Sequence, residues 1–87
     1  MRINHKQQQL MDEMFAKVKE KYPEIVFKGI EFSPDDPEHI WIITIADMDE
    51  DREIEMSEFS AELEIQVLMD YGYAISMMYE NPNSIYV

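Results

Sequence analysis

The stretch that most constrains the fold is the run Ile-Trp-Ile-Ile-Thr-Ile-Ala at residues 40–46. A β-strand with one face in water alternates apolar and polar side chains, whereas a strand that is apolar on both faces needs cover on both. The chain has 87 residues, enough for one domain with a modest core. The run therefore predicts a central strand whose second face is covered by another molecule.

Composition indicates one folded domain over residues 1–87 rather than a disordered acidic tail. Hydrophobic residues make up 46% of the chain, which is enough apolar surface to form a core. The absence of cysteine excludes disulfide bonds, thiol nucleophiles and thiolate metal sites, and it agrees with a reducing compartment. The N-terminus lacks a signal-peptide pattern and no apolar run has membrane-spanning length, so the sequence predicts a cytoplasmic protein.

Charge is distributed unevenly along the chain. The formal net charge is −12, and six of the seven basic residues lie within residues 1–28. Residues 47–64 hold nine acidic residues and one base, Arg52. Such a chain repels phosphate backbones and anionic lipids, so we expect no direct binding to nucleic acid or to membranes.

Local signals predict two helices. Residues 4–21 have the period of an amphipathic helix, with Asn4 as its cap and Gln7 as the capping-box partner. Residues 51–71 form a second helix, whose acidic first turn suits the helix dipole and which ends at Gly72.

The remaining segments predict three strands. Residues 24–32 form a strand whose apolar phase changes at Gly29, as at a β-bulge, and an antiparallel partner follows over residues 39–47. Residues 73–79 form the third strand, and residues 85–87 are either a tail or a short added strand. The predicted fold is α+β, in the order α-β-β-α-β, with a three-stranded sheet and two helices packed on one face.

Two helices on one face leave the other face of the sheet to be covered. Exposed apolar patches larger than about 300 Å² usually mark an interface, and closed two-fold dimers are the commonest way to bury one. We therefore predict a homodimer or a complex with a protein partner, built on side chains that alternate along the second and third strands: Trp41, Ile43, Ile45, Tyr73, Ile75 and Met77.

The acidic segment has the spacing of a calcium-binding loop in part. Asp47, Asp49 and Asp51 stand at the first, third and fifth positions, and Glu58 stands at the twelfth. The sixth position, where the turn needs glycine, is Arg52, and the preceding element is a strand instead of a helix. We therefore expect an acidic helix start without a metal ion, and no cofactor.

The sequence contains no catalytic motif. His5 and His39 lie far apart, and neither has a second histidine at metal-ligand spacing or a nucleophile that it would activate. We predict that the protein is not an enzyme, with no catalytic residues.

Residues 40–79 resemble the latter part of small nucleotidyltransferase-fold proteins. The shared parts are the apolar strand, the acid-rich linker, the long helix and the step Tyr71-Gly72-Tyr73 into a final strand. In that family a Gly-Ser turn binds phosphates, and two aspartates one residue apart hold metal ions at the start of the next strand. Here Gly29 is followed by Ile30, and Asp47 and Asp49 follow a strand instead of opening one. The resemblance implies a catalytically empty relative, of the kind that serves as a toxin–antitoxin partner.

Three classes of function follow. The leading class is a non-enzymatic protein-interaction domain that associates through an apolar sheet face. The second is an acidic mimic of nucleic acid that occupies the basic groove of a DNA- or RNA-binding protein, using the helix stripe Asp51, Glu55, Glu58 and Glu62. The third, a minimal enzyme or metal-dependent transferase, lacks any nucleophile–base pair.

Overall fold

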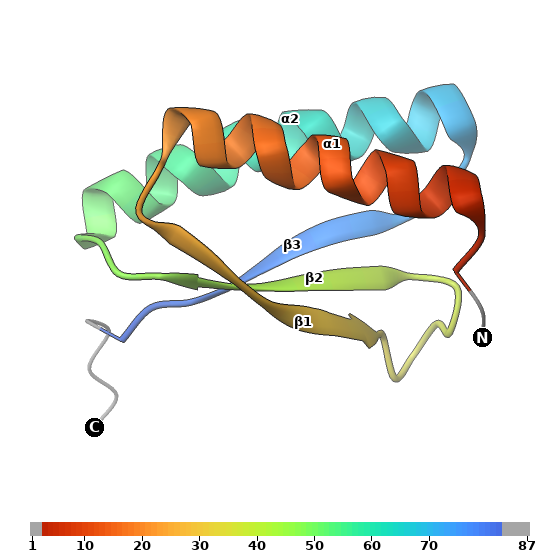
Figure 1. The fold of residues 1–87 in the computed structure, drawn as a ribbon, viewed down its shortest axis with the longest axis horizontal. Coiled ribbons are helices and arrows are strands. Elements are labelled where there is room, and N and C mark those ends of the chain that lie inside the picture. The colour runs from red at the N-terminus through yellow and green to blue at the C-terminus, as the bar shows by residue number, and fades with distance from the viewer. Residues whose placement is uncertain (1–2, 83–87) are drawn as a thin grey trace.

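The computed structural model describes residues 3–82 and has the predicted order of elements (Figure 1). Its elements are α1 (His5–Lys21), β1 (Ile25–Phe32), β2 (Ile40–Ala46), α2 (Glu50–Tyr71) and β3 (Ile75–Glu80). The short strand considered for residues 85–87 lies outside the described residues. Within residues 3–82, no helix is both long and apolar enough to cross a membrane.

Helix α1 begins at the predicted capping box. The Gln7 backbone N–H donates to Asn4 Oδ1 at 2.7 Å, and the Asn4 N–H donates back to Gln7 Oε1 at 2.9 Å. Two orphan donors of the helix start are thus satisfied. Its buried apolar side chains recur at helical spacing and face the sheet: Leu10, Met11, Met14 and Val18.

Helix α2 begins one residue earlier than predicted, with Asp49 as its cap. The Asp49 carboxylate accepts the Arg52 backbone N–H at 2.8 Å, and three acids in the first turn complement the helix dipole. The helix ends at Gly72, whose φ of 75° lies in the left-handed region that glycine adopts without a steric penalty.

The sheet has the order β1-β2-β3, so the apolar run at residues 40–46 is its central strand. Strands β1 and β2 are antiparallel, whereas β2 and β3 are parallel and joined by α2. The predicted bulge is confirmed as a register shift between Phe27 and Gly29. Because of this bulge, Ile25 and Ile30 both pair with helix-facing residues of β2, Ala46 and Ile42, although their sequence separation is odd.

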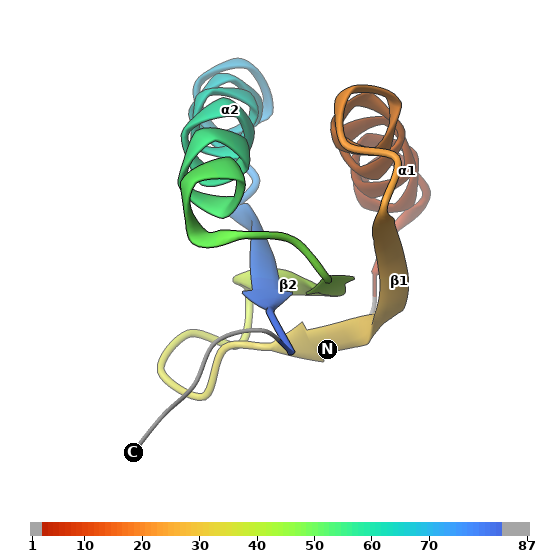
Figure 2. The same ribbon diagram turned by 90° about the vertical axis from the view of Figure 1, so that its left-hand side faces the viewer.

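Both helices cover the same face of the sheet, as predicted (Figure 2). The core lies between the two layers and includes Ile25, Ile42 and Ile75 from the sheet and Val18 and Met56 from the helices, each at most 1% exposed. The two helices run antiparallel and touch at both ends, since Tyr22 packs against Phe59 and Lys6 lies over the ring of Tyr71. Within residues 3–82, no helix lies on the opposite face of the sheet.

Candidate functional site: the open face of the sheet

The face without a helix has an apolar centre. Alternate residues of β2 point to it, and of these Trp41 and Ile45 are half-buried while Ile43 is 6% exposed. Val26 pairs with Ile45 and is 54% exposed, and Met78 pairs with Ile43 and is 39% exposed. These five residues (Val26, Trp41, Ile43, Ile45 and Met78) are called the open-face cluster below.

Polar side chains surround the open-face cluster. The Lys28 ammonium and the Glu80 carboxylate form a 2.8 Å ion pair that joins the two outer strands across β2. Glu31 pairs with Trp41 in the sheet register, and His39 contacts the Trp41 ring edge-on at 6.4 Å between centroids. An apolar centre with a polar rim is the usual anatomy of a protein interface.

The structure divides the six predicted interface residues between the two faces. Trp41, Ile43 and Ile45 lie on the open face, but Ile75 and Met77 are core residues on the helix side, 1% and 6% exposed. Tyr73 precedes β3 and also packs against this core. The prediction that all six share one face is therefore wrong, because the parallel register pairs Ile75 with Ile40 and Met77 with Ile42.

A histidine and a serine that lie 37 residues apart in sequence meet at the rim of this face. His39 Nε2 lies 2.7 Å from Ser76 Oγ, a contact between residues far apart in the chain that the sequence did not predict. Glu64 of α2 lies beside the same serine and accepts the Met77 backbone N–H at 3.0 Å. No short-range signal marks this trio, because each member comes from a different element.

The tautomer of His39 sets what this trio can do chemically. A serine attacks only after passing its proton to a base, and in a catalytic triad the histidine accepts that proton. Here Ser76 Oγ lies beside both His39 Nε2 and the Glu64 carboxyl, whose pKa it lowers, and the tautomer of His39 sets the direction of the His39–Ser76 hydrogen bond. The trio thus ties the start of β2 and the edge of β3 to α2.

Burial nevertheless raises the pKa of Glu64 above its ordinary value of 4.5, outweighing the bonds from Met77 and Ser76 and the nearby His39. The folded chain therefore binds this proton more tightly than the unfolded chain, and stability falls as the pH rises from 4.5 through the folded pKa. We expect Glu64→Gln, which keeps an oxygen for Met77, to be more stable than the wild type at pH 7. This advantage should shrink to zero below pH 4.5.

Urea unfolding between pH 3 and pH 8 measures this difference, and Glu62→Gln is the matched control. Glu62 lies on the same helix and loses the same charge, but it is exposed. A Glu64→Gln variant that is less stable at pH 7, or whose advantage grows in acid, would contradict the assignment.

The acidic segment before and within α2 forms a helix start. The Asp49 carboxylate caps the helix. The guanidinium of Arg52, the residue at the sixth position of the calcium-like spacing, donates to the Glu24 carboxylate at 2.5 Å and 3.1 Å. The Arg52 guanidinium also lies 4.7 Å from the centre of the Tyr22 ring, which ties the start of α2 to the end of α1. Among residues 3–82 no three acidic or histidine side chains are placed to hold a metal ion.

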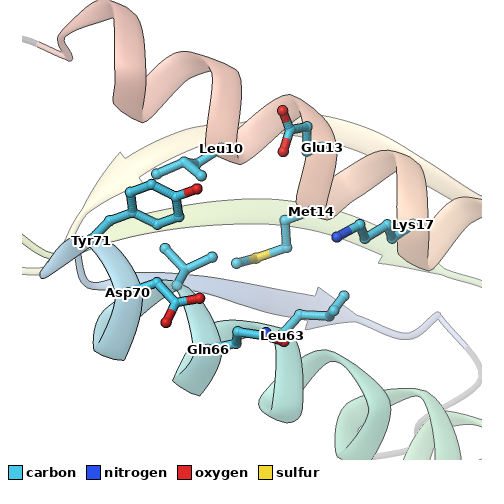
Figure 3. A pocket seen from close by; sticks show the side chains of 9 residues that line it. Leu10, Glu13, Met14, Lys17, Leu63, Gln66, Asp70 and Tyr71 are labelled. Carbon is cyan, nitrogen blue, oxygen red and sulfur yellow. The ribbon is translucent and has the colours of Figure 1, made fainter.

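A groove separates the middle of α1 from the C-terminal half of α2 (Figure 3). It encloses about 210 Å³ and is lined by apolar side chains such as Leu10, Met14 and Leu63 and by charged ones such as Lys17 and Asp70. Figure 3 shows these side chains entering from both helices. The residues that line the groove include no histidine and no nucleophile beside a base. The groove is therefore a partly apolar space between the helices with charged side chains at its rim.

No protein-family model matches the chain, and no curated protein or solved structure gives a significant match. The resemblance to nucleotidyltransferase-fold proteins thus stays a prediction.

Proposed function

We propose that this domain is a non-enzymatic protein-interaction module that pairs two copies of the chain through the open-face cluster. The observation that supports this proposal is the apolar cluster opposite the helices, in which Val26 and Met78 are 54% and 39% exposed and Trp41 and Ile45 are half-buried. Burying it against a second copy removes apolar surface from water, which stabilises the pair by about 25 cal/mol for each Å². In such a pair the two sheets lie face to face, as in a β-sandwich, and the helices lie on the outside.

The edges of the sheet are less suited to association than its open face. Strand β1 is bulged between Phe27 and Gly29, and a bulge disrupts the regular ladder that another strand would need. On the free edge of β3, the Met77 N–H is already bonded to Glu64. Both features oppose pairing through added strands, so the open face is the better surface.

The distribution of charge also favours association through the open face. The acids of α2 lie in the helix layer, on the far side of the sheet from the open-face cluster. The open face carries the Lys28–Glu80 ion pair, which crosses β2, together with Glu31, so two copies meet there with little excess charge. Exposed charges separated by more than about 8 Å are screened at physiological salt.

The size of the face predicts a weak dimer. Three strands about 4.8 Å apart and seven residues long at about 3.3 Å each cover roughly 350 Å² of flat area. Two such faces bury on the order of 700–1,000 Å², at the low end for specific interfaces. We therefore expect association at micromolar rather than nanomolar concentrations.

Sedimentation velocity at rising concentration tests the proposal. The wild type should shift from monomer to dimer on approaching about 100 μM, a dissociation constant typical of weak complexes. Val26→Asp should remain monomeric, because it places a charge within the contact while Val26 is exposed enough for the fold to survive. Leu68→Asp is the control, since Leu68 is 51% exposed on α2 and should leave the dimer intact.

A wild type that stays monomeric at about 100 μM, or a dimer that Leu68→Asp disrupts and Val26→Asp does not, would contradict the proposal. Circular dichroism of each variant checks that the fold is kept.

A further inference from the structure

Helix α2 has a second apolar stripe that the fold does not bury. Its core-facing side holds Met56 and Ser60, which are 0% and 1% exposed. Along another side, four large apolar side chains lie more than half in water: Ile54 at 52%, Ile65 at 58%, Leu68 at 51% and Met69 at 79%. We call these four residues, with the exposed Ala61, the α2 stripe.

The spacing of the α2 stripe is that of a helix–helix seam. Ile54, Ala61 and Leu68 recur every seven residues, and Ile65 follows Ala61 by four. A repeat of seven keeps side chains on one line of a helix that packs along a second helix. The stripe runs from residue 54 to residue 69, about 22 Å at 1.5 Å for each residue. That length suits a partner helix of about four turns.

Charge decides what kind of helix fits there. The flank of the α2 stripe is a row of exposed acids, Asp51, Glu55, Glu58 and Glu62, and at 100° per residue Glu58 and Glu62 lie next to Ile54 and Ile65. The single base on α2, Arg52, points toward Tyr22 and is paired with Glu24. A second copy of α2 would therefore set one acid row near another, whereas lysine or arginine on the partner would neutralise the row.

We propose that the α2 stripe is a second docking surface, which binds a basic amphipathic helix of a different protein. Leucine-like side chains of that helix pack on Ile54, Ile65 and Leu68, and its basic residues face Glu58 and Glu62. This proposal does not depend on self-association through the open-face cluster, because the two surfaces lie on different layers of the fold.

A designed helical peptide tests the surface without knowledge of the natural partner. The probe has leucine at the seam positions and lysine elsewhere over about 18 residues. One control peptide replaces lysine by glutamate, and another replaces leucine by serine. Calorimetric titration should give one site with a micromolar dissociation constant for the probe and no binding for the glutamate peptide.

Variants of the protein locate the site. Ile65→Ser combined with Leu68→Ser should weaken binding of the probe at least about tenfold, since apolar anchors dominate such contacts. Glu58→Gln with Glu62→Gln should weaken it about threefold and reduce its salt dependence. Val26→Ser is the matched control, because Val26 is 54% exposed on the open sheet face and should leave peptide binding unchanged.

Three outcomes would overturn the proposal. The first is probe binding that is unaffected by the change at Ile65 and Leu68. The second is equally tight binding of the serine peptide, which would mean that the acid row acts alone, as in a mimic of nucleic acid. The third is a homodimer dissolved by Ile65→Ser with Leu68→Ser, which would make a second copy the occupant. Failure of self-association with intact peptide binding would overturn only the proposed function.

Discussion

Replacing Met56 by alanine is expected to lower the free energy of unfolding by about 2–5 kcal/mol. Met56 is 0% exposed in the core between α2 and the sheet, so the truncation removes buried contacts and leaves a cavity. A domain of this size is expected to have about 5–10 kcal/mol of total stability, so such a loss takes a large share of it.

The same substitution at Met69 is the matched control for Met56. Both methionines lie on α2, but Met69 is 79% exposed and should cost less than about 0.5 kcal/mol on truncation. Urea unfolding of the two variants measures the difference. Equal losses at Met56 and Met69 would mean that the rotation of α2 about its axis is misassigned.

Met77→Ala is expected to cost about 2–4 kcal/mol, whereas Met78→Ala should cost less than about 1 kcal/mol. The two neighbours point to opposite faces of β3: Met77 is 6% exposed in the core, and Met78 is 39% exposed on the open face. Met77 and Met78 are the same residue type at adjacent positions, so the difference between the two losses of stability measures the difference in burial. Both variants should be measured at low micromolar concentration, so that association does not stabilise either one.

A larger loss of stability for Met78→Ala than for Met77→Ala would contradict this prediction and would support the face assignment made from the sequence. That assignment grouped Met77 with Trp41, and the structure groups Met78 with it.

Local signals predicted the parts of the fold that local chemistry determines. The capping box at Asn4, the bulge near Gly29 and the helix end at Gly72 all depend on residues a few positions apart. The division of β3 into two sets of alternating residues also follows from its own sequence. Which set faces the helices does not, because it depends on the register with β2, a strand about 35 residues earlier.

The candidate site was predictable in part for the same reason. The apolar run at residues 40–46 places Trp41, Ile43 and Ile45 on one face by alternation alone. On α2, two apolar stripes compete for the core, and the structure buries Ser60 while Ile65 stays 58% exposed. The side with Ser60 also holds Met56, Phe59 and Leu63, which lie in or against the core. Both stripes are thus apolar, and the packing of the whole domain decides which one is buried. The contact of His39 with Ser76 likewise needs the assembled sheet.

The central claim is that two copies meet through the open-face cluster, and intermolecular contacts measured by NMR test it most directly. A sample at about 300 μM, roughly three times the expected dissociation constant, would mix isotope-labelled and unlabelled chains. Isotope-filtered spectra then show contacts between copies only. We expect cross-peaks that link the Trp41 ring of one copy to the methyl groups of Val26 or Met78 of the other. Spectra without intermolecular cross-peaks at this concentration, or with cross-peaks only from Ile65 and Leu68, would contradict the claim.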